Sequence, residues 1–109
     1  MAGKIDRYTD FWPFYLKEHR KPTTRAFHYF GTAAGIVLLV VALATQTWWL
    51  LPVALVCGYF FAWISHFFIE KNRPATFTYP LWSFVSDFRM LGAWLAGKLS
   101  NELTKYQIR

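Results

Sequence analysis

Residues 26–69 read AFHYFGTAAGIVLLVVALATQTWWLLPVALVCGYFFAWISHFFI, and this stretch contains no Asp, Glu, Lys or Arg. All twelve basic and all six acidic residues of the 109-residue chain lie outside it. A helix that crosses a membrane needs about 20 apolar residues, so the stretch is too long for one crossing and fits two. The sequence therefore predicts a transmembrane helical hairpin.

The stretch divides at a short polar turn, Thr45–Thr47. We expect the first span at about residues 25–44 and the second at about residues 50–72. Trp48 and Trp49 follow the turn, and paired tryptophans are typical of the interface at which a span meets the headgroups. The turn is therefore expected at the far side of the membrane from both chain ends.

The flanks of the hairpin predict two amphipathic surface helices, at about residues 10–20 and 80–98. In the first flank, ring-bearing side chains recur at spacings of three and four, at Tyr8, Phe11, Tyr15 and His19. Such a spacing defines one helix face, which we expect to lie on the bilayer surface. The alternative is an N-terminal segment that becomes ordered only by packing on the hairpin.

The second flank carries an apolar stripe at helical spacing, formed by Leu81, Phe84, Phe88, Leu91 and Leu95. Asp87 lies off this stripe and is expected to be solvated rather than to bind a ligand. The polar tail from Ser100 onward is expected to fray. Residues 1–109 are thus predicted to form a single all-α membrane domain.

The charge distribution indicates how this domain is oriented. Both flanks are net positive, and basic residues close to spans mark the cytoplasmic side. We therefore expect an integral, multi-pass protein with both termini in the cytoplasm, in contact with the lipid bilayer. The apolar half of the chain argues against a nucleic-acid partner, while an oligomer is compatible with these patterns. Cys57 is the single cysteine, which excludes an intrachain disulfide and a cysteine-cluster zinc site.

Two histidines occupy equivalent positions in the two spans. His28 precedes Thr47 by 19 residues and His66 follows it by 19, which places both about 28 Å from the turn at a rise of 1.5 Å per residue. Small residues that favour close helix packing share their faces, at Gly31, Gly35, Gly58 and Ala62. Both imidazoles are therefore expected to point into the contact between the spans, just inside the cytoplasmic interface.

Two further residues complete a candidate metal-binding set without sulfur. Glu70 follows His66 by four residues, and His19 precedes Pro22, where the chain can fold back over the same point. Nitrogen and oxygen ligands suit iron, zinc or manganese. A closed tetrahedral set would favour structural zinc, and open positions would favour iron and dioxygen chemistry.

Alternative interpretations remain for the same residues. The histidines could simply join the helices by hydrogen bonds or hold a structural metal, which would make this a non-enzymatic membrane protein. Glu70 could instead pair with Arg25, Lys71 or Arg73.

Two motifs resemble those of a known family of small membrane proteins. The first is Phe14-Tyr15-x-x-x-His19-x-x-Pro22-x-x-x-x-x-His28, and the second is His66-x-x-x-Glu70-Lys71-x-Arg73-Pro74-Ala75. The family was long labelled a domain of unknown function, and it includes the fungal Mpo-type dioxygenases of 2-hydroxy fatty acids. The resemblance covers about residues 10–90, although the fungal members have a larger membrane section between the motifs.

The resemblance implies an iron(II)-dependent dioxygenase of fatty-acid α-oxidation. Its substrates would be dioxygen and a long-chain 2-hydroxy fatty acid, and its product an acid one carbon shorter. The catalytic, metal-binding histidines of the family would correspond to His19, His28 and His66, to which our own reading adds Glu70. A site at this depth would leave the acyl tail in lipid, with the substrate carboxylate bound by Arg25, Lys71 or Arg73.

Overall fold

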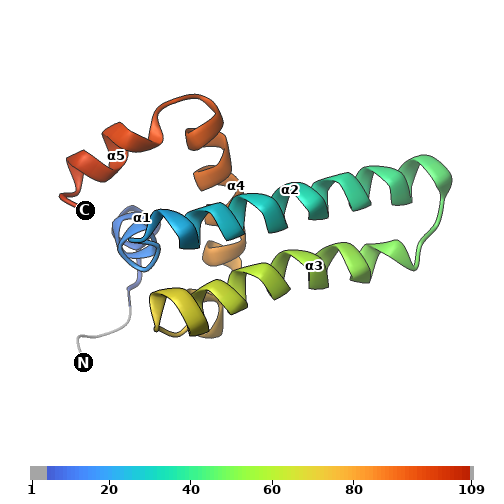
Figure 1. Cartoon of the computed structure of the whole chain (residues 1–109), viewed down its shortest axis with the longest axis horizontal. Helices are drawn as coiled ribbons and strands as arrows, with labels where there is room; N and C mark the ends of the chain where they lie inside the picture. The colour runs from blue at the N-terminus through green and yellow to red at the C-terminus, as the bar shows by residue number, and fades with distance from the viewer. Residues whose placement is uncertain (1–4, 109) are drawn as a thin grey trace.

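The computed structural model describes residues 5–108, and every regular element in this range is helical. The two helices α2 (Pro22–Thr45) and α3 (Leu50–Ile64) run side by side as a hairpin (Figure 1). The α3 helix continues directly into a π-helical segment, η1 (Ser65–Glu70). The expected all-α fold with a helical hairpin is thus confirmed.

The turn of the hairpin is closed by a left-handed residue. Gln46 follows α2 with a φ of 55°, and the backbone N–H of Thr47 donates to the carbonyl of Ala42 at 3.0 Å. A left-handed residue at this position is a common way to end a helix, because it lets the last carbonyls find donors.

The two helices of the hairpin approach closely because glycines face the contact. A Cβ atom placed on Gly31 would lie 3.0 Å from the Cβ of Phe61 and 3.1 Å from the carbonyl oxygen of Gly58. A Cβ atom on Gly35 would lie 3.1 Å from the carbonyl oxygen of Ala54. The small residues in this seam therefore allow backbone to contact backbone, as in close-packed membrane helices.

The remaining helices gather at the end of the hairpin opposite the turn (Figure 1). They are α1 (Tyr8–Lys17), the 3₁₀ turn η2 (Ala75–Phe77), α4 (Pro80–Leu95) and α5 (Leu99–Lys105). We call these elements the base, and we call residues 36–57 of the hairpin, which project from it, the arm.

The base contains the hydrophobic core of the protein. Its buried members come from all of its helices: Phe11, Trp12, Tyr15, Leu16, Ala75, Met90, Leu99, Leu103 and Ile108. The aromatic face of α1, which we expected on the bilayer surface, is instead turned into this core. The reason is that α4 and α5 supply an apolar partner for it, so that rings such as Phe11 lose contact with both water and lipid.

Polar contacts fix the base around this core. The indole N–H of Trp12 donates to Glu102 at 2.9 Å, and the guanidinium of Arg89 lies 4.0 Å from the centre of the same ring. Leu99, Leu103 and Ile108 are buried, so the expectation that the tail frays from Ser100 onward is wrong. Periodic leucines within a polar segment are enough to dock it on an existing core.

The α4 helix presents two different faces. Its buried face is formed by Ser83, Ser86 and Met90, which pack toward the core. Most of the predicted apolar stripe, including Phe84 and Phe88, is exposed instead. An exposed apolar stripe on a helix at the membrane interface is suited to contact with lipid.

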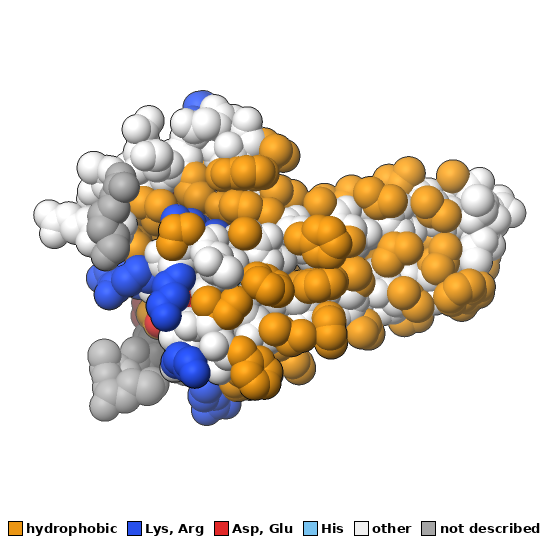
Figure 2. All heavy atoms as spheres, viewed as in Figure 1, with side chains coloured by type: hydrophobic (Ala, Val, Ile, Leu, Met, Phe, Trp, Pro, Cys, Tyr) orange, Lys and Arg blue, Asp and Glu red, His pale blue; other side chains and the backbone are white. Residues whose placement is uncertain are grey.

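The surface separates the charged base from the apolar arm. Figure 2 shows hydrophobic side chains along the whole visible side of the arm and Lys and Arg side chains gathered at the opposite end. Two helical stretches, Pro22–Thr45 and Leu50–Glu70, are long and apolar enough to cross a membrane.

Candidate metal centre

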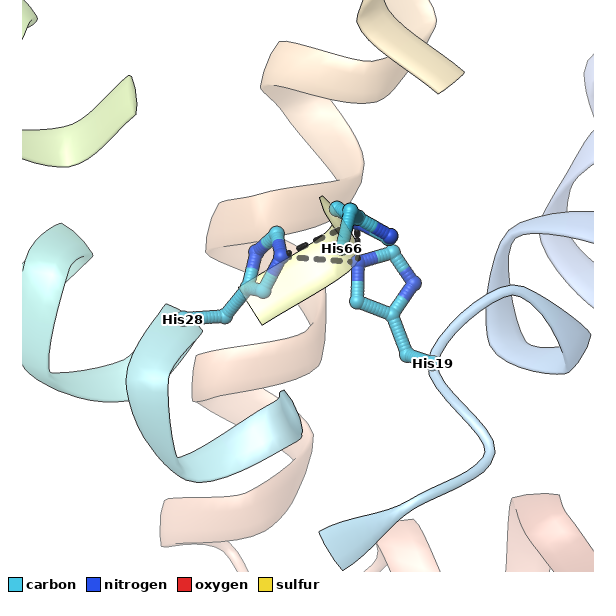
Figure 3. Close-up of side chains that lie close together, drawn as sticks. All are labelled: His19, His28 and His66. Atoms are coloured by element: carbon cyan, nitrogen blue, oxygen red, sulfur yellow. Dashed lines mark hydrogen bonds between the residues drawn. The ribbon is translucent and has the colours of Figure 1, made fainter. Parts of the chain in front are cut away.

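Three histidines from three different segments meet where the base joins the hairpin (Figure 3). His19 lies in the loop after α1, His28 in the second turn of α2, and His66 in η1. Their side chains are almost fully buried, with exposed fractions of 1%, 4% and 1%. The structure therefore brings together the three histidines that the sequence singled out.

Local backbone features place two of these side chains. The guanidinium of Arg25 donates to the carbonyl of His19 at 2.9 Å, which ties the loop to the first turn of α2. Around His66 the helix widens to the π form, and the backbone N–H of Asn72 donates to the carbonyl of His66 at 2.9 Å. A π-helical turn changes the direction of side chains and is frequent at functional sites.

The Nε2 atoms of the three imidazoles form a small triangle. The distances are 3.0 Å between His19 and His28, 3.0 Å between His19 and His66, and 3.2 Å between His28 and His66. These distances would suit hydrogen bonds only if one Nε2 atom of each pair carried a proton.

The Nδ1 atoms show which nitrogens carry the protons. Nδ1 of His19 lies 2.7 Å from the carbonyl of Tyr15, and Nδ1 of His66 lies 2.7 Å from Oδ1 of Asn72. Nδ1 of His28 lies 3.3 Å from Oδ1 of Asp87, although it is not well directed for a hydrogen bond. Because the carbonyl of Tyr15 and Oδ1 of Asn72 can only accept, Nδ1 of His19 and Nδ1 of His66 are assigned the protons, and the nearby carboxylate of Asp87 favours the same tautomer in His28. Each neutral ring in this form presents a bare Nε2 lone pair to the triangle.

Three lone pairs that face one another repel unless a cation lies between them. Such an arrangement is typical of metal-binding histidines, whose second ring nitrogen donates to a carbonyl, an amide or a carboxylate. Nitrogens about 2.1 Å from a metal ion lie about 3.0 Å apart when their bonds meet at right angles and about 3.4 Å apart at the tetrahedral angle. Two of the observed edges equal the first value and the third lies midway between the two, so the residues fit an ion that keeps further coordination positions.

Asp87 and Tyr15 extend the site beyond the histidines. The hydroxyl of Tyr15 donates a short hydrogen bond to Oδ1 of Asp87, the same oxygen that faces His28. Burial raises the pKa of Asp87 from 3.8 to about 6, although the hydrogen bond from Tyr15 acts in the opposite direction. Burial also lowers the pKa of His19 well below its ordinary value, and the imidazoles of His28 and His66 lower it further. His19 is therefore held in the neutral form that binds metal.

The structure does not bring Glu70 into this group. Its Oε1 accepts a hydrogen bond from the backbone N–H of Lys21 at 2.6 Å, at the start of α2. A carboxylate is favoured there by the positive end of the helix dipole. The α-helical spacing that would align Glu70 with His66 does not apply within the π-helical segment. Within residues 5–108, the donor group that fits one ion consists of the three histidines alone.

The three basic residues proposed for substrate binding lie near the N-terminus of α2 and the C-terminus of η1. Arg25 donates to the carbonyls of His19 and Arg20, at 2.9 and 2.8 Å. Lys71 is exposed in a left-handed conformation directly after η1, and the guanidinium of Arg73 lies 5.3 Å from the centre of the Phe77 ring.

Two residues of the site were not anticipated as functional. Asp87 was expected to be solvated, but its side chain is only 14% exposed and faces His28. The available signal was that Asp87 is the single acidic residue between Glu70 and Glu102. Asn72 was given no functional role at the expected end of the second span, yet its amide links His66 to the carbonyl of Glu18, which accepts from Nδ2 at 3.1 Å.

Comparison with known families identifies the chain. The model of a family described as 2-hydroxy-palmitic acid dioxygenase Mpo1-like matches residues 5–99, so the chain belongs to this family. This agrees with the resemblance seen in the motifs. Neither the curated proteins nor the solved structures gave a match.

Proposed function

We propose that this Mpo1-like protein is an integral membrane enzyme that uses iron(II) and dioxygen to shorten long-chain 2-hydroxy fatty acids by one carbon. The observation that carries the proposal is the buried triangle of Nε2 atoms, each on a ring whose Nδ1 faces an acceptor. The description of the family supplies the class of substrate and reaction.

The proposed position in the membrane follows from the two surfaces. The hairpin of α2 and α3 would cross the hydrocarbon region, and the basic residues at the end opposite its turn would meet anionic headgroups on the cytoplasmic side, together with both termini. Cysteine labelling at positions 5 and 105 tests this topology. Labelling of the two positions from opposite sides of the membrane would contradict it.

Each residue of the site has a role in this proposal. His19, His28 and His66 would hold the ion, while Tyr15, Asn72 and Asp87 fix the orientation of the three rings. An iron(II) ion held by these histidines would supply open coordination positions for the hydroxyl and carboxylate oxygens of the substrate and for dioxygen chemistry. Overall, one 2-hydroxy acid and one dioxygen would give the shortened acid, carbon dioxide and water.

The polar head of the substrate would reach the ion from the membrane interface. Arg25 contacts the carbonyl of His19, and Lys71 and Arg73 follow η1 directly, so these three residues remain our proposed partners for its carboxylate. The tail of the substrate would stay among apolar side chains. An unhydroxylated acid should be a poor substrate, because it lacks the oxygen that completes the chelate.

A structural metal is the second candidate function. This function is favoured because the ligands come from different parts of the molecule. His19 lies in the loop that leaves the base, whereas His28 and His66 belong to the hairpin. One ion would then join the two parts of the molecule, as structural zinc does in small proteins.

The test uses the full chain in lipid nanodiscs, loaded anaerobically with iron(II). Dioxygen and 2-hydroxyhexadecanoic acid are then added, and mass spectrometry follows the acid shortened by one carbon, with hexadecanoic acid as control. We expect the shortened acid only from the hydroxylated substrate and not from a His66→Ala variant. A folded, iron-loaded sample that consumes no dioxygen and forms no shortened acid would contradict the enzyme and leave the structural role.

A further inference from the structure

A groove runs along the hairpin on the side that α4 crosses. Its walls come from α2, α3 and α4, and its volume is about 200 Å³. Small residues along the seam, Gly31, Gly35, Ala54 and Gly58, line it where the two helices approach most closely.

The groove begins beside the histidines. Asp87 lines its end, and the same carboxylate faces His28 at 3.3 Å and accepts the hydrogen bond from Tyr15. Thr32 and Gly35 also line it, and they follow His28 on one face of α2 at steps of four and seven residues. One end of the groove is therefore separated from the metal centre by a single side-chain contact.

The polarity of the groove changes along its length. Its polar side chains, Thr32, Tyr59 and Asp87, lie at the end nearest the histidines. Toward the turn of the hairpin the lining is apolar, with Leu39 from α2 and Leu51 from α3. The polar end of the groove thus matches the head group of a single-chain lipid, and its apolar end matches the tail. The head group would lie at the metal centre.

The groove is open along its side. Ile36, Leu39 and Leu55 line it and are 36–51% exposed, as are Phe84 and Phe88 of α4 at 40–42%. In a bilayer these side chains would face acyl chains rather than water. A lipid could therefore enter sideways from the membrane without passing through the charged end of the base.

The length of the groove suits an acyl chain. From Tyr59 to Leu51 the α3 wall covers eight residues, or about 12 Å at the rise of an α-helix. One leaflet of a bilayer is about 15 Å deep in hydrocarbon, half of the core thickness. The groove is thus nearly as long as the hydrocarbon depth of one leaflet, and it could accept most of an acyl chain that extends through that depth.

We infer that this groove binds the acyl chain of the fatty acid whose head group reaches the histidines, and that Ile36 and Leu39 set how much of the chain it accepts. The inference rests on the proposed function for the identity of the head group. The occupant is an acyl chain and not a second copy of the protein, because the polar end of the groove meets the metal centre and its apolar end meets lipid.

A matched pair of variants tests the groove. Ile36 lines it, whereas its neighbour Val37 lies at nearly the same depth but outside the lining. We expect Ile36→Trp to fill the groove and Val37→Trp to point into bulk lipid. Both side chains are partly exposed, so neither change should disturb the core; circular dichroism and metal content check this.

The first measurement is photolabelling without dioxygen, so that it does not depend on turnover. The probe is a 2-hydroxyhexadecanoic acid with a diazirine in mid-chain, and peptide mass spectrometry locates the label. We expect labelling within residues 31–39, 51–59 and 84–88, which excess 2-hydroxyhexadecanoic acid suppresses. Ile36→Trp should reduce this competed labelling at least 10-fold, and Val37→Trp should leave it unchanged.

The outcomes separate the groove from the reaction. Competed labelling in the groove without any shortened acid would support the groove and overturn the dioxygenase. Uniform, uncompeted labelling around the arm would overturn the groove, as would equal effects of the two tryptophans on product formation. A wild-type dimer that Ile36→Trp alone converts to a monomer would assign the groove to a second copy and overturn the inference.

Discussion

The base and the arm place similar side chains in opposite environments. In the base, Phe11, Tyr15 and Met90 are completely buried among α1, α4 and α5. In the arm, Val37 and Val40 are 60% and 58% exposed, and contact between the helices depends on small residues. The base is therefore stabilised as a soluble core is, by burial of large apolar groups, whereas the arm exposes its large apolar groups and is held together by close backbone packing.

The histidines lie at the boundary between these two regions. His19 is carried by the loop that leaves the base, and His28 and His66 are carried by the hairpin. An ion bound to all three would make the stability of each region depend on the other. The predictions below test this coupling, beginning with the largest expected effect.

Replacing His28 or His66 by Ala should remove the metal. Each change leaves two nitrogens of the triangle, and we expect the metal content to fall from about one ion per chain to near zero. Elemental analysis of purified protein measures this. Hydrogen exchange should also increase in residues 18–21 of these variants, because the loop loses its link to the hairpin.

Glu70→Gln is the matched control for the histidine variants. Glu70 contacts the N–H of Lys21 and lies outside the histidine group, so this variant should keep its metal. Loss of metal from Glu70→Gln would restore Glu70 as a ligand. Full metal in both folded histidine variants would place the site elsewhere.

The second prediction compares the packing of the two regions. Met90→Ala should destabilise the base by about 2–5 kcal/mol, because it leaves a cavity in the core. Val40→Ala removes apolar atoms from an exposed position of the arm and should change stability by less than about 0.5 kcal/mol. Hydrogen exchange in α1 and α5 measures the opening of the base. Equal effects of the two changes would mean that the arm is packed against something that the monomer lacks.

The third prediction concerns the support of the metal site. Asp87→Asn keeps the shape of the side chain but removes the charge that faces Nδ1 of His28. Changes in such supporting partners typically weaken metal binding by about 10–100-fold, and we expect a loss at the lower end of that range. Competition with a chelator measures the dissociation constant.

Tyr15→Phe should have a smaller effect on metal binding than Asp87→Asn. It removes the hydroxyl that donates to Asp87 but leaves the backbone carbonyl that accepts from His19. Metal binding should therefore weaken less than in Asp87→Asn. If Tyr15→Phe weakened binding more, Tyr15 and not Asp87 would be the main support of the site.

Much of the hairpin could be predicted from the sequence, because its signals depend only on positions along the chain. The uncharged stretch of residues 26–69 gave two helices, and equal spacing from Thr47 aligned His28 with His66. The approach of His19 rested on Pro22 and on the family motif, and the structure brings its ring within 3.0 Å of both partners. The two helices and the alignment of His28 with His66 depend on length, charge and helical rise alone, whereas the approach of His19 does not.

The base could not be predicted in the same way, because its contacts join distant parts of the chain. The burial of Asp87 depends on Tyr15, which is 72 positions away, and on the packing of α4 across the hairpin. The direction of Glu70 depends on a π-helical turn that has no clear sequence signal. Periodicity identified α1 and α4, but it identified neither α5 nor the partners of the helix faces in the base.

The last and smallest effect compares two glycines. Alanine at Gly31 would meet the Cβ of Phe61 and the carbonyl of Gly58 at about 3 Å, so the hairpin must open slightly. Alanine at Gly92 in α4 would meet no atom within 4 Å among the described residues. Glycine within a helix costs about 0.5–1 kcal/mol relative to alanine, so Gly92→Ala should stabilise the protein by about that amount. Gly31→Ala has the same favourable change in helix propensity, but the added methyl group overpacks the contact between the helices. We therefore expect a net destabilisation of about 0.5–2 kcal/mol.

Thermal unfolding in one detergent, followed by near-ultraviolet circular dichroism, compares the two variants. The midpoint should rise for Gly92→Ala and fall for Gly31→Ala. Because Gly31 also lies one turn beyond His28 on the same face, opening of the seam should weaken metal binding in Gly31→Ala, while Gly92→Ala should bind as the wild type does. Two midpoints that shift in the same direction would show that the seam tolerates a methyl group. The close approach of the two helices would then not be what holds the hairpin and its histidines in place.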